Sequence, residues 1–138
     1  MYRLGQTSNE RLAGVDGRLV EIVKLALKFG LIDITIIEGV RSKEKQNKLF
    51  SEGKSKVMWP NSRHNIRNGE DKAMAVDAAP YVNGRLSWDS RHCIYMAGVI
   101  MSAAAVLGYR LRWGGNWDQD GEPVTDQTFD DLVHFELR

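Results

Sequence analysis

The longest regular pattern in the chain is a run of apolar residues at helical spacing over residues 88–107. Ser87 stands before this run and Gly108 directly after it, and these residue types favour the start and the end of a helix. Methionine and alanine at this spacing are typical of a helix that packs into a core. The residues expected to point inward are Trp88, Cys93, Met96, Ala97, Ile100, Met101, Ala104 and Leu107.

Four shorter segments have the β-branched or alternating pattern of strands. We expect the second of them to stop near Pro80, and the Asn83-Gly84 pair that follows to form a turn. The segments are DITIIEGVR at 33–41, AMAVDAAPYV at 73–82, YRLRWGGNW at 109–117 and DLVHFELR at 131–138.

Two further helices are predicted, one over residues 9–29 and one over 42–52 that begins at Ser42. The polar segment 53–72 is predicted to be a long loop, and loops of this length are often functional. Together these elements predict a single α+β domain over residues 1–138, in which a small antiparallel sheet packs against helices.

Composition excludes several classes of function. The formal net charge is +1, so there is no electrostatic case for binding nucleic acid. Cys93 is the only cysteine, which excludes an internal disulfide and a thiolate-rich zinc cluster. Residues 1–14 contain no apolar signal core, and no run of about 18 apolar residues occurs. We therefore expect a cytoplasmic protein without stable membrane association, which another agent must release if it acts outside.

Two of the predicted strands carry a polar residue that is costly to bury. Asp77 lies in an otherwise apolar strand, where an ionised carboxylate must be paired or bound to a metal. In the last strand, alternation places Leu132, His134 and Glu136 on one face. If the two strands are neighbours, the carboxylate and the imidazole meet, and His64 can reach them from the preceding loop.

The residue pattern alone leaves two interpretations open. Asp77 can cap a turn, and His134 can make an ordinary hydrogen bond within the core. Alternatively, two histidines and one carboxylate bind zinc and leave its fourth position open, which is typical of a catalytic site and not of a structural one. No HExxH motif is present to decide between these interpretations.

A set of motifs, taken in order, favours the metal site. The motifs are EGVRSKEKQ at 38–46, SRH at 62–64, AMAVDAAPYVNGRLSW at 73–88, RWGGNW at 112–117 and FDDLVHFEL at 129–137. With them the chain resembles the zinc peptidases of the D-alanyl-D-alanine carboxypeptidase and hedgehog-like superfamily. Within this superfamily it is most similar to phage endolysins of the L-alanyl-D-glutamate peptidase type, and the resemblance covers nearly the whole chain.

The resemblance implies a zinc-dependent endopeptidase that hydrolyses the L-alanyl-D-glutamate bond in the peptide stem of bacterial peptidoglycan. It also implies a hedgehog- and D,D-peptidase-like fold, a monomer, and a role in lysis of the bacterial host. Such enzymes accumulate in the host cytoplasm without a signal peptide and reach the cell wall when the membrane is permeabilised. The alternatives are a D-alanyl-D-alanine carboxypeptidase or dipeptidase, and a zinc-binding module without catalysis.

Carried over residue by residue, the resemblance assigns the zinc ligands. They are His64 from the Ser-x-His motif, Asp77 from the Ala-x-Asp motif and His134 from the terminal Asp-x-x-His motif. Asp131 matches the catalytic carboxylate, and Arg41 matches the arginine that orients the substrate or stabilises the oxyanion. The other residues assigned to the substrate side are Gln46, Ser62, Trp113 and Trp117.

Two of these assignments have competitors. The family spacing would select Asp71, seven residues after His64, whereas Asp77 lies thirteen residues after it. We prefer Asp77 because it lies in a strand and has the alanine, proline and tyrosine of the motif around it. The additional residues then form an enlarged loop. Asp131 is preferred over Asp130 because it alone keeps the three-residue offset from His134.

Three other side chains have two interpretations each. Trp113 and Trp117 either line a substrate groove or form a packed aromatic turn beside two glycines. Glu136 either orients one of the ligands from behind or takes part in a surface ion pair.

Overall fold

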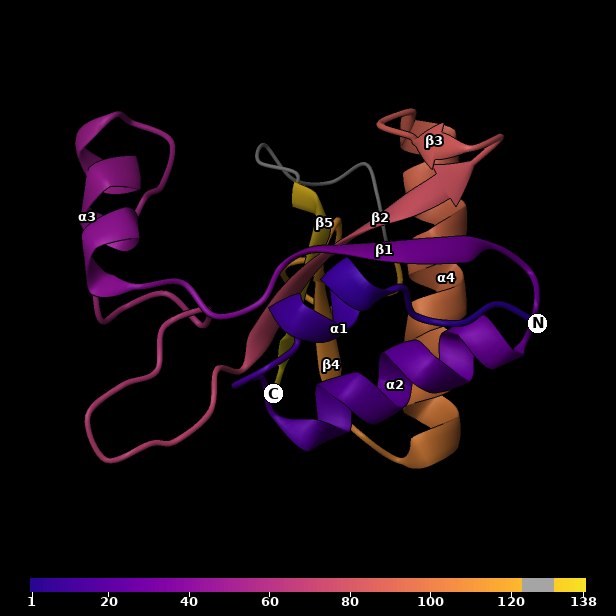
Figure 1. Ribbon diagram of the computed structural model, residues 1–138, viewed down its shortest axis with the longest axis horizontal. Helices are drawn as coiled ribbons and strands as arrows, with labels where there is room; N and C mark the ends of the chain where they lie inside the picture. The colour runs from indigo at the N-terminus through magenta and orange to yellow at the C-terminus, as the bar shows by residue number, and fades with distance from the viewer. Residues whose placement is uncertain (123–130) are drawn as a thin grey trace.

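The computed structural model describes residues 1–122 and 131–138. Its sheet runs in the order β1-β2-β5-β4, with β3 paired to β2 outside this path, and all pairings are antiparallel. Helices α2 and α4 pack against each other and against the sheet, whereas α3 stands apart from them (Figure 1). The predicted α+β class is therefore confirmed. The elements are α1 (Gln6–Arg11), α2 (Gly17–Lys28), β1 (Asp33–Glu38), α3 (Lys43–Ser51), β2 (Ala75–Val82), β3 (Arg85–Leu86), α4 (Ser90–Leu107), β4 (Leu111–Gly114) and β5 (Asp131–Leu137).

Helix α4 is the predicted apolar helix. The Asp89 side chain caps it by accepting a hydrogen bond from the N–H of Arg91, and Gly108 ends it in the left-handed conformation. The prediction that Trp88 points inward is wrong, because Trp88 precedes the cap and is 62% exposed. Among the described helices, α4 alone has the length and mean hydropathy of a membrane span, but its buried face, which includes Met96, belongs to the core.

The helix predicted over residues 9–29 is two helices, α1 and α2, so this prediction is wrong. Gly14 between them has φ of 84°, which a continuing helix does not allow. Asp16 then caps α2 by accepting a hydrogen bond from the N–H of Arg18. Local capping thus interrupts a segment whose apolar residues keep helical spacing.

Strand β2 continues past Pro80, so the prediction that the proline stops it is also wrong. The Pro80 carbonyl accepts a hydrogen bond from the N–H of Ser87. Because the nitrogen and the carbonyl of one strand residue point the same way, the missing N–H faces away from β1 and interrupts no hydrogen bond to it. Asn83 and Gly84, with φ of 53° and 80°, form the predicted turn.

The pairing of β2 with β5 positions the candidate site. Asp77 and His134 are direct partners across these two strands, as their expected proximity requires. Helix α3 begins where predicted, with Ser42 as its cap. The segment 53–72 contains no helix or strand, as predicted, and it brings His64 to the same region of the sheet.

Candidate active site

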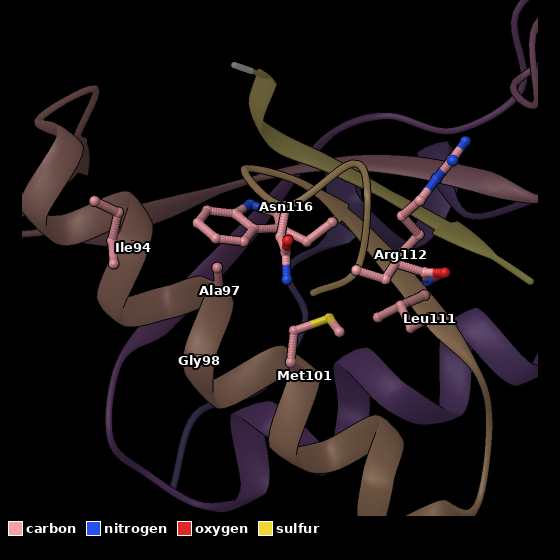
Figure 2. Close-up of a pocket in the computed structure, with 9 residues that line it drawn as sticks. Ile94, Ala97, Gly98, Met101, Leu111, Arg112 and Asn116 are labelled. Atoms are coloured by element: carbon pink, nitrogen blue, oxygen red, sulfur yellow. The ribbon is translucent and has the colours of Figure 1, made fainter. Parts of the chain in front are cut away.

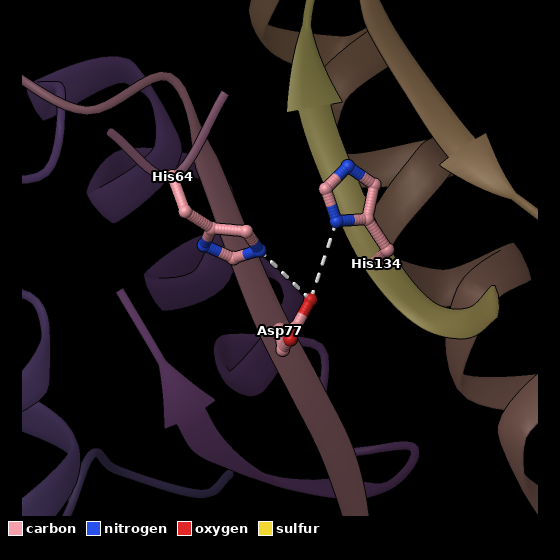
Figure 3. A group of neighbouring side chains, drawn as sticks. All are labelled: His64, Asp77 and His134. Atoms are coloured by element: carbon pink, nitrogen blue, oxygen red, sulfur yellow. Dashed lines mark hydrogen bonds and ion pairs between the residues drawn. The ribbon is translucent and has the colours of Figure 1, made fainter. Parts of the chain in front are cut away.

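Three side chains from separate segments meet beside the β2–β5 pair. Nε2 of His64 and Nδ1 of His134 lie 3.2 and 3.3 Å from the same oxygen, Oδ1 of Asp77 (Figure 3). The three potential ligand atoms all lie within 4.8 Å of one another. Both histidines are buried, and we call these residues the His-Asp-His group. The structure brings together the three residues that the sequence assigns as ligands.

Each histidine of this group is held from behind by a second acceptor. Nδ1 of His64 lies 2.8 Å from the carbonyl oxygen of Gly39, and Nε2 of His134 lies 2.9 Å from Oε1 of Glu136. A neutral imidazole has one donor, so one of its nitrogens then faces an acceptor with its lone pair. Either a second proton on a ring or a cation between the two rings and Asp77 removes this conflict, and two nitrogens with one carboxylate oxygen are ligands suited to a divalent metal.

The charges of the group reinforce this arrangement. Burial on its own would raise the pKa of Asp77, but hydrogen bonds with His134 and His64 outweigh burial and hold the pKa well below its usual range. Burial would likewise lower the pKa of His134, yet hydrogen bonds to Asp77 and Glu136 raise it to about 9. A bound metal would replace protons at this site, since ligands bind metals in their deprotonated form.

The segment that carries His64 is fixed by hydrogen bonds at both sides. The Ser62 hydroxyl accepts from the N–H of His64, and the N–H of Arg41 donates to the carbonyl of His64. Asn65, which is fully buried, accepts from the N–H of Ser62 and donates to the carbonyl of Arg41. Asn65 was not predicted as a site residue, although its place directly after the Ser-x-His motif was a usable signal.

Gly39 is required where it is, because its backbone passes close to helix α1. A Cβ atom at this position would overlap the carbonyl oxygen of Arg11 and contact the side chain of Val15. We expect Gly39→Ala to lower the free energy of unfolding by about 1–3 kcal/mol, the usual cost of overpacking. Denaturation in urea measures this change.

Gly98→Ala in α4 is the matched control for this substitution. A Cβ atom there meets nothing within 4 Å, and alanine in a helix is favoured over glycine by about 0.5–1 kcal/mol. If Gly39→Ala were as stable as the unmodified protein, the close approach that places the Gly39 carbonyl behind His64 would be refuted.

Arg41 lies beside the group and is itself held in place. Its Nε and Nη2 donate to the two carboxylate oxygens of Glu38 at 2.9 and 3.1 Å, and its Nη1 donates to Oε1 of Gln46 at 3.0 Å. Nη2 also lies 4.0 Å from Oδ2 of Asp77. Gln46 is fully buried and positions Arg41 through this hydrogen bond.

Glu38 is a functional candidate that the sequence analysis missed. Burial would raise its pKa, but hydrogen bonds from Arg41 and Lys45 outweigh burial and lower the pKa. Its position three residues before Arg41, at the end of an apolar strand, was the available signal.

A cavity of about 850 Å³ opens onto the His-Asp-His group, and Asp131 lines it. Burial, and then the negative charge of Asp77, raise the pKa of Asp131. Strict alternation along β5 would place Asp131 and His134 on opposite faces. The β4–β5 pairing is irregular at this point, because its register shifts between Trp113 and Gly114, which pairs with Asp131. Asp131 and His134 both line the cavity.

The same irregularity corrects two expectations for β5. Leu132 packs against the hydrophobic core and does not line the cavity with His134, so the predicted alternation is wrong for this residue. Glu136 is 4% exposed, which contradicts the interpretation as a surface ion pair. Asp130, the competitor of Asp131, lies outside the described residues. Asp71 is exposed and is not part of the His-Asp-His group.

The two tryptophans have different surroundings. Trp117 lines the cavity, and its ring centroid lies 5.4 Å from that of His134. Trp113 is 5% exposed, and its indole N–H donates to the carbonyl of Leu132. It lines a separate apolar cavity of about 410 Å³ between α4 and β4 (Figure 2) and is not among the described residues that line the larger cavity, which favours its interpretation as a packed aromatic side chain.

Two imidazoles and a carboxylate face a common point, and a further carboxylate lies in the same open cavity. This arrangement defines the class of protein as a hydrolase whose site can hold a metal ion. A family model described as phage L-alanyl-D-glutamate peptidase matches residues 1–138, and the chain belongs to this family. The predicted family and the predicted class of enzyme, a peptidase that hydrolyses peptidoglycan, are thereby confirmed.

Individual relatives agree with this result. The L-alanyl-D-glutamate peptidase of Escherichia phage T5 is 27% identical to this chain over 122 residues, which cover 88% of this chain and 85% of the relative. The crystal structure of the Serratia marcescens L-Ala D-Glu endopeptidase ChiX matches with a TM-score of 0.78 and 30% identity, over 96% of this chain and 87% of that chain.

Proposed function

We propose that the chain is a zinc-dependent endolysin that cuts the L-alanyl-D-glutamate bond in the peptide stem of peptidoglycan. The observation that carries the proposal is the convergence of His64, Asp77 and His134. Nε2, Oδ1 and Nδ1 of these residues, respectively, would hold the ion. Two nitrogens and one oxygen suit zinc in a catalytic site, which keeps one position open.

A bound zinc ion supplies two effects, polarisation of the scissile carbonyl and acidification of a water molecule. The residues of the chain perform the other functions. Asp131 lines the same cavity but is not part of the His-Asp-His group, so its carboxylate is free to accept a proton from water and to give it to the departing amine. Burial and the charge of Asp77 raise the pKa of Asp131 above that of an exposed aspartate, which makes the carboxylate a better proton acceptor.

Arg41 has the role of holding developing negative charge. Glu38 and Gln46 use three of its five N–H donors, and the guanidinium stays fixed beside Asp77. The remaining donors lie on its two terminal nitrogens, where they can stabilise the oxyanion of the tetrahedral intermediate. Ser62 and Asn65 support catalysis indirectly, since they fix the segment that carries His64.

We further propose that the protein acts as a monomer and is stored in the host cytoplasm until the membrane is permeabilised. The alternative activity, removal of a terminal D-alanine, uses the same metal chemistry at a different bond of the stem.

Treatment of purified sacculi with the protein is expected to release stem peptides that begin with D-glutamate, and no free D-alanine. Addition of a chelator should abolish this release, and zinc should restore it, because the open position on the ion is required. Mass spectrometry of the soluble fragments reports both the bond and the metal requirement. Release of D-alanine would support the carboxypeptidase activity, and full activity in the presence of chelator would refute the requirement for a metal ion.

A further inference from the structure

Three arginines converge on one carboxylate behind His134. Nη2 of Arg112 lies 2.9 Å from Oε2 of Glu136, Nη1 of Arg138 lies 3.7 Å from it, and Nε of Arg63 lies 3.9 Å from it. Arg63 comes from the 53–72 segment, Arg112 from β4, and Arg138 follows β5. All three line the cavity of the active site, and we call them the arginine cluster.

The cluster has more positive charge than its partner can neutralise. Glu136 is one carboxylate for three guanidinium groups, and its other oxygen already binds His134. Within residues 1–122 and 131–138, Nε of Arg63 and Nε of Arg112 are buried without a hydrogen-bond acceptor. Buried donors without acceptors are costly. Because one carboxylate would need only one guanidinium to neutralise it, pairing with Glu136 does not explain why three arginines gather here.

A second group of cations at the cavity has a smaller excess of positive charge over nearby carboxylates. Arg41 and Lys45 share the carboxylate of Glu38, whose two oxygens accept hydrogen bonds from Arg41, and Arg41 also faces Asp77. The two cations therefore pair closely with the carboxylate of Glu38, and Arg41 makes a longer contact with a second carboxylate, that of Asp77. The arginine cluster is accordingly the stronger candidate for binding an anionic group.

The substrate bond supplies such a group. In an L-alanyl-D-glutamate bond, the nitrogen of the scissile peptide belongs to the D-glutamyl residue. This residue has two carboxyl groups, of which at most one continues the peptide, so a free carboxylate lies within one residue of the cut. Guanidinium groups bind carboxylates through paired, charge-assisted hydrogen bonds.

We propose that the arginine cluster binds the free carboxylate of the D-glutamyl residue and thereby places the scissile bond beside the His-Asp-His group. The cluster is separated from that group by the Glu136 carboxylate and the His134 ring. The guanidinium of Arg112 also lies 5.2 Å from the ring centroid of Trp117, and both residues line the cavity. This inference rests on the proposed function.

Two synthetic stem peptides test the proposal, one with the free carboxylate on D-glutamate and one with a carboxamide in its place. The unmodified protein should cleave the carboxylate peptide with a kcat/KM about tenfold higher or more, the value of one charge-assisted hydrogen bond. Arg138→Gln and Arg63→Gln should each bring this ratio towards one, by slowing cleavage of the carboxylate peptide alone. Arg138→Lys, which keeps the charge but not the planar fork, should keep part of the preference.

Arg91→Gln is the matched control, because Arg91 lies in α4, is not among the residues that line the cavity, and forms an ion pair with the nearby Asp89. It changes the net charge equally and should leave the ratio as in the unmodified protein. Calorimetric binding of the product peptide that begins with D-glutamate gives a second readout. Its affinity should fall in the cluster variants, whereas that of the carboxamide form should not.

Three outcomes would overturn the inference. The ratio could stay unchanged in both cluster variants although they cleave the bond, which leaves the proposed function intact. The preference could disappear in Lys45→Gln instead, which would assign the carboxylate to the other group of cations. If the unmodified protein cleaved neither peptide, the proposed function itself would fail, and the inference with it.

Discussion

Asp131→Asn is expected to lower kcat by about 10²–10⁴-fold, the usual contribution of a general acid–base group. Asparagine has nearly the same shape but cannot take a proton from water or pass one to the leaving amine. Asp131 lies in the cavity and is separate from the His-Asp-His group, so the variant should keep its zinc and its stability. Rates of stem-peptide release, zinc content by atomic absorption and thermal unfolding measure the three properties together.

Asp130→Asn is the matched control, since Asp130 is the neighbouring carboxylate that the offset from His134 does not select. Only a small change in kcat is expected for it. If Asp131→Asn lost its zinc along with its activity, Asp131 would be a ligand and not a proton carrier. If Asp131→Asn were fully active, the proposed role would have to be given up.

The sequence predicted those features that depend on local pattern. Helix α4 and the strands around Asp77 and His134 follow from apolar spacing, and hydrogen bonding between β2 and β5 then made the two residues partners. The break between α1 and α2 was not predicted, because the left-handed Gly14 and the capping Asp16 outweigh the apolar spacing that continues across them. Periodicity records which residues are apolar, and it does not record where the backbone turns.

The parts of the site that were missed depend on contacts between distant segments. The place of Leu132 is associated with an irregularity in the pairing of β5 with β4, which no property of β5 alone indicates. The arginine cluster joins residues 63, 112 and 138, and each of them separately resembles an ordinary surface arginine. Trp113 and Trp117 were equivalent in sequence, and only their packing separates the core residue from the one that lines the cavity.

Asp77→Asn is expected to abolish zinc binding at micromolar zinc and to reduce hydrolysis at least as far as Asp131→Asn does. The substitution replaces the carboxylate that both histidines face with a neutral amide, which is a much poorer metal ligand, so two imidazoles remain as the effective ligands. Even changes outside the ligands typically cost about 10–100-fold in metal affinity, so loss of a ligand should exceed this range. Titration of the metal-free protein with zinc, followed by calorimetry, measures the affinity directly.

Asp71→Asn provides the comparison, because the family spacing selects Asp71 whereas the fold selects Asp77. The Asp71 side chain is exposed and lies in the enlarged segment before β2, so its loss should leave zinc affinity and kcat within about twofold, as for most surface substitutions. The reverse pattern, with zinc lost in Asp71→Asn and kept in Asp77→Asn, would mean that the segment 65–72 rearranges on binding the ion. In that case position along the chain, and not pairing between strands, would determine the ligand.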